Sequence, residues 1–186
     1  MRACVYCGSS AGDDPRFVAA ARAFGAMLAQ HGIGIVYGGG RVGLMGALAD
    51  AALAQGGEVI GIIPQFLEER EVAHRGVDLR VVTSMHERKA MMAELANAFV
   101  ALPGGFGTLE EFFEIVSWVQ LGLTEAPCIL ANVDGFYTPL LAAIDRARET
   151  GFVSARSRAI VEACDSLEQV VERLQARAPG EEAHRA

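Results

Sequence analysis

Glycines and carboxylates gather at residues 103–111, which read PGGFGTLEE. An apolar run precedes this stretch and an amphipathic run follows it, so the pattern predicts a strand, a tight glycine turn and a helix. Gly104, Gly105 and Gly107 free the backbone to approach a ligand closely. Amide groups at such a helix start, together with the positive end of the helix dipole, bind anions. The stretch therefore predicts a phosphate-binding turn.

Thr108 and Glu111 also have a purely structural interpretation. Their spacing fits a capping box, in which Thr108 caps the helix and Glu111 bonds back to the cap amide without taking part in chemistry. Three glycines in four positions, however, weaken a helix start unless something needs the exposed backbone. The structural interpretation of Glu111 stays open, while the glycines favour a ligand.

Two adjacent cations, Arg88 and Lys89, lie upstream of the glycine turn, and Lys89 is the only lysine in the chain. Ser84 and Glu87 fit a capping box, which predicts that a helix begins there and places both cations in its first turns. The helix dipole disfavours cations at this end, so two of them indicate an external anion. The alternative is a solvated surface pair.

Gly38, Gly40 and Gly43 form a loose GxGxxG-like series after the second predicted strand. A dinucleotide fingerprint belongs after the first strand, with an acidic ribose-binding residue about 20 positions further on. Glu58 is near that distance, but it precedes the next predicted strand instead of ending it. We interpret the series as a backbone contact to substrate and not as an NAD site.

The four cysteines, Cys4, Cys7, Cys128 and Cys164, each fall in or near an apolar segment, as buried free thiols do in a reducing compartment. Cys4 and Cys7 have redox or zinc spacing. They lie within a strand-like run, however, and no second Cys or His pair offers the other half of a zinc site. The sequence therefore predicts plain packing for the cysteines and no metal site.

Strand-like and helix-like segments alternate along the chain. This alternation predicts an α/β fold, a Rossmann-like doubly wound parallel sheet with helices on both faces, whose ligand binds at the carboxyl ends of the strands. Residues 65–78 are charged and irregular, which indicates a lid or rim, and residues 151–161 are less regular. The predicted strands are residues 3–6, 33–37, 58–63, 79–83, 98–102 and 127–132, and the predicted helices are residues 15–30, 44–55, 84–97, 109–119, 137–150 and 166–176.

Length and composition limit the classes of function. The 186 residues predict one domain over residues 1–178 and a disordered tail over 179–186. A hydrophobic content of 52% fits a large buried interface, so we expect a homodimer. The formal charge of −7 argues against nucleic acid or an anionic membrane as partner and favours a small molecule. With no long apolar run at the start or elsewhere, the expected location is cytoplasmic.

Taken together, PGGFGTLEE at residues 103–111 and the preceding Arg88-Lys89 resemble the Lonely Guy family, whose signature is PGGxGTxxE after an Arg-Lys pair. The resemblance extends to CVYCGSS at residues 4–10, the GGG turn at 38–40 and IIP at 62–64, and so spans most of residues 2–150. It implies a Rossmann-like homodimer that hydrolyses the N-glycosidic bond of cytokinin riboside 5′-monophosphates, or of AMP. The products are the free N6-substituted adenine and ribose 5-phosphate, and no cofactor is needed.

The resemblance also implies roles for individual residues. Arg88 and Glu111 match the family's catalytic pair. A carboxylate near C1′ stabilises an oxocarbenium-like state and orients water, while a permanently charged arginine stabilises the departing purine or fixes the nucleotide. The positions that match substrate contacts are Glu71, Lys89, Gly104, Gly105, Gly107, Thr108 and Glu110.

Two other functions can be weighed against the residues. Members of this family have carried a lysine decarboxylase label, but that chemistry needs a Schiff-base lysine, for which Lys89 is the only choice. A carrier of a phosphorylated cofactor, such as the molybdenum cofactor carriers, is the stronger alternative. A carrier needs the phosphate turn but neither Arg88 nor Glu111, so these two residues discriminate between the carrier and the hydrolase.

Overall fold

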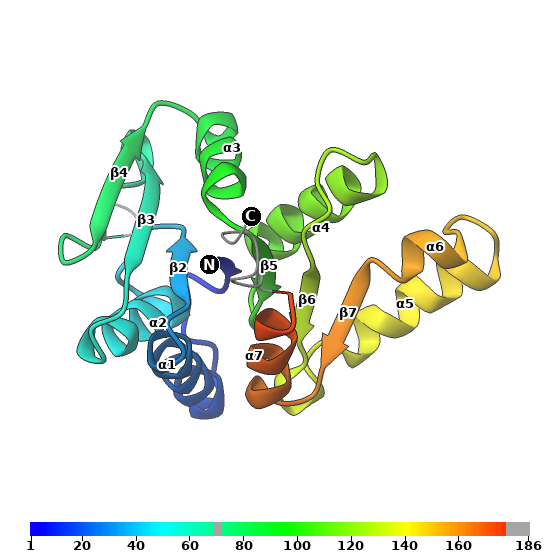
Figure 1. The fold of residues 1–186 in the computed structure, drawn as a ribbon, viewed down its shortest axis with the longest axis horizontal. Coiled ribbons are helices and arrows are strands. Elements are labelled where there is room, and N and C mark those ends of the chain that lie inside the picture. Colours follow the sequence, from blue (N-terminus) through cyan, green and yellow to red (C-terminus); the bar gives the residue numbers. More distant parts are fainter. Residues whose placement is uncertain (69–71, 178–186) are drawn as a thin grey trace, which may run out of the picture.

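The computed structural model describes residues 1–68 and 72–177 and contains one parallel sheet of seven strands in the order β4-β3-β2-β1-β5-β6-β7 (Figure 1). Glu71 and the predicted tail lie outside the described residues. The strands are β1 (Arg2–Tyr6), β2 (Gly34–Tyr37), β3 (Val59–Pro64), β4 (Asp78–Val82), β5 (Ala98–Ala101), β6 (Cys128–Ala131) and β7 (Val161–Cys164). The α-helices are α1 (Pro15–Gln30), α2 (Gly43–Ala54), α3 (Met85–Leu95), α4 (Phe106–Gln120), α5 (Thr138–Glu149), α6 (Ala155–Arg158) and α7 (Leu167–Gln175), and two 3₁₀ turns are η1 (Gln65–Leu67) and η2 (Val133–Gly135).

The strand order reverses at β1, which pairs with β2 on one side and with β5 on the other. Cys4, for example, lies opposite Val36 of β2 and Phe99 of β5. The prediction of a doubly wound parallel sheet is therefore confirmed. In such a sheet the connections leaving the two strands at the reversal diverge to opposite faces, and a crevice opens at their carboxyl ends.

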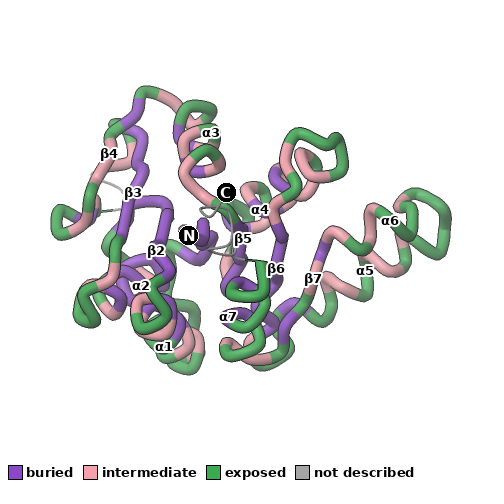
Figure 2. The backbone as a smooth tube through the Cα atoms, in the orientation of Figure 1, coloured by how far each residue is buried: buried purple, intermediate pink, exposed green. Residues whose placement is uncertain are grey.

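Helices cover both faces of the sheet (Figure 2). The buried side chains form two core clusters. Along β1, Val5 packs with the core under α1, α2 and α7, whereas Cys4 and Tyr6 pack with the core under α3 and α4. Because β1, β2, β5 and β6 are buried on both faces, they read in the sequence as continuous apolar runs. Phe24 of α1 and Phe112 of α4 are each 0% exposed, and burying a side chain of this kind stabilises the fold by about 1.5–3 kcal/mol.

The four cysteines are buried and free, as the sequence predicted. Burial raises the pKa of the Cys128 thiol to about 12 and those of Cys4 and Cys7 further still. These thiols therefore stay protonated at neutral pH. No helix within residues 1–68 and 72–177 has the length and apolar character needed to cross a membrane.

Candidate active site at the carboxyl edge of the sheet

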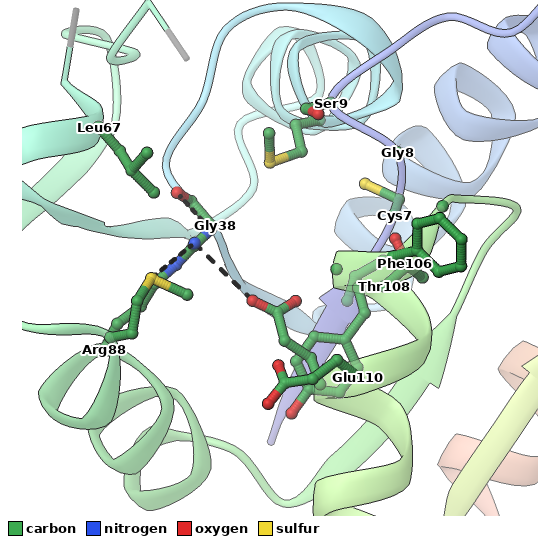
Figure 3. A pocket seen from close by; sticks show the side chains of 16 residues that line it. Cys7, Gly8, Ser9, Gly38, Leu67, Arg88, Phe106, Thr108 and Glu110 are labelled. Carbon is green, nitrogen blue, oxygen red and sulfur yellow. Dashed lines mark hydrogen bonds and ion pairs between the residues drawn. The ribbon is translucent and has the colours of Figure 1, made fainter. Parts of the chain in front are cut away.

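A cleft of about 270 Å³ opens where β1, β2 and β5 end, at the reversal of strand order. Figure 3 shows that its walls come from segments far apart in the chain, among them Cys7 and Ser9 after β1, Gly38 after β2, Arg88 of α3 and Thr108 of α4. This is the position at which open α/β sheets bind ligands. The expected location of the ligand site therefore coincides with a cleft.

The start of α4 forms one wall of the cleft. Gly105 is the N-cap of α4 and gives no side-chain bond, and the first intrahelical bond runs from the Leu109 amide to the Gly105 carbonyl at 3.1 Å. The amides of Phe106, Gly107 and Thr108 thus precede the first helical bond and have no intrahelical acceptor, as at any helix start. They are available to an anion in the cleft.

The interpretation in which Thr108 caps this helix and Glu111 closes a capping box is wrong. Gly105 has the extended backbone of an N-cap residue (φ −93°, ψ −154°), so α4 begins at Phe106 and Thr108 already lies inside it. Glu111 then lies about a turn beyond the position from which a capping box is closed. Its carboxylate therefore has no capping role.

Gly104 is required by packing, since an added Cβ would collide with the Thr108 hydroxyl, but Gly105 and Gly107 differ from it. A Cβ at either position would meet no protein atom within 4 Å, and neither residue has a positive φ angle. Neither packing nor backbone conformation therefore demands glycine here. What the missing side chains do provide is access to the first-turn amides of α4, which supports a ligand at this point.

Arg88 is one of the two buried residues of α3, with Met92, and is only 5% exposed. Its Nη2 donates to the Gly38 carbonyl at 3.1 Å, and its Nη1 lies 3.8 Å from Glu111 Oε1. Gly38 makes this arrangement possible, because a Cβ there would collide with Arg88 Nη2. The interpretation of Arg88 as a solvated surface cation is therefore wrong, and a buried cation and a carboxylate face the same cleft.

Lys89 lies next to Arg88 in the sequence but points elsewhere. Its ammonium donates to Glu110 Oε1 at 2.6 Å and lies 3.0 Å from Glu114 Oε1, and its side chain is 13% exposed. Burial lowers the pKa of Lys89, but the bonds to Glu110 and Glu114 outweigh burial, and the pKa is raised overall. Lys89 is therefore a paired cation and not a solvated one.

The cleft brings together most of the residues that the sequence singled out. Arg88 and Glu111 face each other across it. Gly104 and Lys89 border the cleft without lining it, and Glu71 lies outside the described residues. The other predicted positions that line it are Gly105, Gly107, Thr108 and Glu110.

Sequence reasoning missed the apolar side of the cleft, which Met45 of α2, Met85 of α3 and Leu67 of η1 contribute. Methionines and leucines on helices are normally core residues, so nothing in the pattern marked Met45 or Met85. Leu67 falls in the segment 65–78 that was predicted to form a lid or rim. The segment was predicted from its charged residues, and the apolar Leu67 was not singled out. The cleft therefore has apolar side chains in its lining as well as the polar start of α4.

Comparison with known proteins finds relatives that match nearly the whole chain. A family model described as possible lysine decarboxylase matches residues 45–174. The cytokinin riboside 5′-monophosphate phosphoribohydrolase LOG1 of Arabidopsis thaliana is 44% identical over 182 residues, which cover 97% of this chain and 85% of the relative. The cytokinin riboside 5′-monophosphate phosphoribohydrolase LOG of Oryza sativa is 46% identical and covers 96% of this chain and 74% of the relative. The cytokinin riboside 5′-monophosphate phosphoribohydrolase of Rhodococcoides fascians is 47% identical and covers 90% of this chain and 85% of the relative.

Solved structures with the same fold are more distant in sequence. The molybdenum cofactor binding protein from Rippkaea orientalis superposes with a TM-score of 0.69 at 22% identity, covering 94% of this chain and 95% of that one. The molybdenum cofactor carrier protein of Chlamydomonas reinhardtii gives a TM-score of 0.68 at 18% identity, covering 94% and 96%. At this identity the similarity shows a shared fold alone.

Proposed function

The chain belongs to the Lonely Guy family of phosphoribohydrolases, and we propose that it hydrolyses the N-glycosidic bond of cytokinin riboside 5′-monophosphates and of AMP. The products are the free N6-substituted adenine and ribose 5-phosphate. The observation that carries the proposal is the pairing of Arg88 with Glu111 in a cleft that also contains the open start of α4. One end of the cleft suits a phosphate, and the other suits a reaction that develops positive charge.

The phosphate end anchors the substrate. The amides of Phe106, Gly107 and Thr108 lie at the positive end of the α4 dipole, and Gly105 and Gly107 place no side chain over them. Binding energy gained at a non-reacting phosphate positions the sugar for reaction. This accounts for a preference for nucleoside monophosphates over nucleosides.

Glu111 and Arg88 carry the chemistry in this proposal. Cleavage of the C1′–N9 bond passes through an oxocarbenium-like state, which the Glu111 carboxylate stabilises while it orients or deprotonates the attacking water. Arg88 is permanently protonated, so it stabilises the negative charge of the departing purine or fixes the nucleotide and is a poor proton donor. Its bond to the Gly38 carbonyl holds it toward the cleft.

Further substrate contacts are assigned by the family's motif. They are Glu110, which lines the cleft, Lys89, which borders it, and Glu71. The rest of the proposal concerns the whole chain: one domain over residues 1–178, acting in the cytoplasm as a homodimer on a small molecule.

Decarboxylation of lysine is disfavoured by the state of Lys89. A Schiff-base lysine attacks as the neutral amine, whereas the bonds of Lys89 to Glu110 and Glu114 raise its pKa overall and keep it charged. A carrier of a phosphorylated cofactor would use the start of α4 but would have no need of a buried arginine against a carboxylate. The hydrolase is therefore the function that the cleft supports best.

Release of free base is the decisive measurement. The protein is incubated with AMP, N6-prenyl-AMP, other nucleoside monophosphates and the matching nucleosides, with and without chelator, and free base is quantified by chromatography. We expect base from AMP or N6-prenyl-AMP without added metal, and much less from the nucleosides. Tight binding of nucleotide without base release would favour the carrier, and loss of activity with chelator would contradict the metal-free mechanism.

A further inference from the structure

The glycine turn at residues 38–40, which follows β2, is joined to a loop segment that precedes β4, residues 72–76. We call this loop segment the clamp segment. Its backbone contacts with the turn are the bond from the His74 amide to the Gly39 carbonyl at 2.9 Å, the bond from the Arg41 amide to the Val72 carbonyl at 2.9 Å, and an isolated antiparallel bridge between Gly40 and Ala73. The clamp segment therefore holds the turn whose first carbonyl accepts from Arg88 (Figure 3).

The His74 side chain anchors the clamp segment to α2. His74 is 4% exposed, and its Nε2 lies 3.0 Å from Oδ1 of Asp50, a residue of α2. Its Nδ1 accepts a hydrogen bond from the Gly76 amide at 3.1 Å. Because a backbone amide can only donate, Nδ1 carries no proton, and the neutral ring donates from Nε2 to the aspartate. Both nitrogens of the buried ring thus have partners.

Two residues of the clamp segment show that its conformation is imposed by these contacts. A Cβ at Gly76 would lie 3.0 Å from His74 Cε1, and Gly76 has no positive φ angle, so contact with the ring accounts for the glycine. Val72 has a φ of 48°, which a β-branched residue rarely adopts. Backbone in such a conformation persists only where its surroundings fix it. Here the bond from Arg41 and the anchored ring of His74 do so.

The clamp segment reaches the cleft through one carbonyl group. Three successive glycines have few conformational limits of their own, so bonds from outside decide how the turn at residues 38–40 is oriented. The bond from His74 fixes the Gly39 carbonyl, and the neighbouring peptide unit carries the Gly38 carbonyl, which accepts from Arg88 Nη2 at 3.1 Å. The contacts therefore run without a gap from α2 to the guanidinium in the cleft.

We propose that His74 is a positioning residue, which clamps the glycine turn through its bond to Asp50 and so aims the Gly38 carbonyl at Arg88. His74 does not line the cleft, so it acts through the turn and not on the substrate. This inference rests on the proposed function for its kinetic consequences, whereas the clamp itself does not. Part of the segment 65–78, predicted from its charges to be a lid or rim, thereby has a fixed duty at the site.

Kinetics of variants at both ends of the anchoring bond test the role. His74→Phe keeps a flat ring but loses both ring bonds, and we expect kcat/KM for AMP to fall by roughly 10-fold or more. Asp50→Ala removes the same bond from a side chain that is 53% exposed, and should lower kcat/KM in the same direction without harm to the core. His74→Gln keeps an N–H donor for Asp50 and should recover most of the rate. His31→Phe is the matched control, because its ring bonds the Met27 carbonyl at 2.8 Å at the exposed end of α1.

A double-mutant cycle separates positioning from general damage. Gly38→Ala displaces the Arg88 guanidinium directly, so in that background the clamp has nothing left to aim. The double variant with His74→Phe should therefore lose little more than the larger single loss, whereas sites that act independently give the product of their losses. The product of the two losses would overturn the positioning role. Thermal unfolding of every variant separates lost folding from lost turnover.

Two NMR measurements test the clamp without turnover. In ¹⁵N-labelled protein at about pH 8, the ring signal that His74→Phe removes from those of the four histidines should be that of the Nε2–H tautomer. Hydrogen exchange at the Arg41 amide should become roughly 10-fold faster or more in His74→Phe and in Asp50→Ala, and stay unchanged in His31→Phe. An Nδ1–H tautomer, or unchanged exchange in both clamp variants, would refute the clamp even if the protein releases base. Both expected results in a protein that releases no base would refute the hydrolase and support the clamp.

Discussion

Arg88 shows how this site makes a buried charge tolerable. A cation that is 5% exposed needs partners, and Arg88 has the Gly38 carbonyl and the Glu111 carboxylate. The glycine is as necessary as the charges, because any side chain at position 38 would occupy the place of the guanidinium. A residue with no side chain therefore helps to set the chemistry of the cleft.

Glu111→Gln tests whether the carboxylate is catalytic. Because α4 is capped at Gly105 and not by a Thr108–Glu111 box, any loss of thermal stability in this variant reports the lost partner of the buried Arg88 and not a lost helix cap. We expect kcat for AMP to fall by ~10²-fold or more, since the amide cannot stabilise the oxocarbenium-like state, while the nucleotide still binds at the start of α4. Near-normal turnover in this variant would contradict a catalytic role for the Glu111 carboxylate.

Gly38→Ala tests the positioning of Arg88 by steric means. The new methyl group collides with Arg88 Nη2, so we expect kcat/KM to fall by ~10²-fold, as a displacement of about 1 Å in an active site can cause. Gly25→Ala is the matched control, since its methyl group collides with the Leu48 backbone between α1 and α2. The control should lower the melting temperature and leave turnover per folded molecule unchanged. Equal kinetic damage in both variants would contradict a specific role for Gly38.

The helices that start at the cleft could be predicted from the sequence only in part. Ser84 accepts a bond from the Glu87 amide at 3.1 Å, so the predicted start of α3 is confirmed. Glu87, however, reaches the Thr83 amide at 2.8 Å and not the amide of Ser84. For α4 the same kind of pattern failed, because the helix begins three residues earlier, after the extended backbone of Gly105. Residue spacing alone does not specify the backbone conformation of a glycine-rich turn.

β7 was missed for a related reason. Val161–Cys164 has buried residues at its ends and more exposed ones between them, which is neither a continuous apolar run nor an alternating one. It becomes a strand because it pairs with the edge of β6. Val161 lies opposite Cys128, and Cys164 lies opposite Ala131. Pairing with a partner distant in sequence outweighs the weak local signal.

Glu87→Gln tests the anchoring of α3 through its pH dependence. Bonds from the Thr83 amide and then the Thr83 hydroxyl lower the pKa of Glu87 below the ordinary value of 4.5. A depressed pKa adds stability that is present above the unfolded value and is lost as the pH falls through the folded value. The variant should therefore unfold at lower urea concentration than the unmutated protein near pH 7, and the gap should close below about pH 4.5. A gap that stayed constant with pH would show that the carboxylate charge has no such role.

At the scale of the whole molecule, the strand order explains why Arg88 and Glu111 meet. The chain leaves the outer strand β4, passes through α3 across β3, β2 and β1, and enters β5 (Figure 1). The start of α3 therefore lies at the carboxyl edge of the sheet, as does the start of α4 after β5. Alternation of segments predicted the parallel sheet, but the order of its strands depends on long-range pairing, which no local pattern specifies. Only the family motif predicted that Arg88 and Glu111 lie together.

The expected homodimer needs an apolar surface that the monomer leaves uncovered. Phe112 and Ile115 of α4 cannot supply it, since they are 0% and 3% exposed under the chain's own sheet. Exposed apolar side chains do lie at the other end of α4, where Leu121 and Leu123 are 72% and 69% exposed. Beside them lies a hollow between α3 and α4, which is lined mostly by apolar residues: Ala90, Ala93, Phe99, Ile115, Trp118 and Leu123, with Glu94 and Thr124. Exposed apolar surface next to a hollow is typical of a surface that a partner covers.

We therefore predict that multi-angle light scattering at micromolar concentration gives twice the 19.7 kDa mass of one chain, and that Leu123→Asp shifts the protein toward the monomer. A charge buried in an apolar interface is strongly unfavourable, so the substitution should raise the dissociation constant of the dimer measurably. Phe152→Asp is the control, because Phe152 is 88% exposed at the turn after α5 and does not line the hollow between α3 and α4. If the unmutated protein is a monomer, the homodimer prediction is wrong. If Phe152→Asp dissociates the dimer and Leu123→Asp does not, the interface lies at the α5 end of the molecule instead.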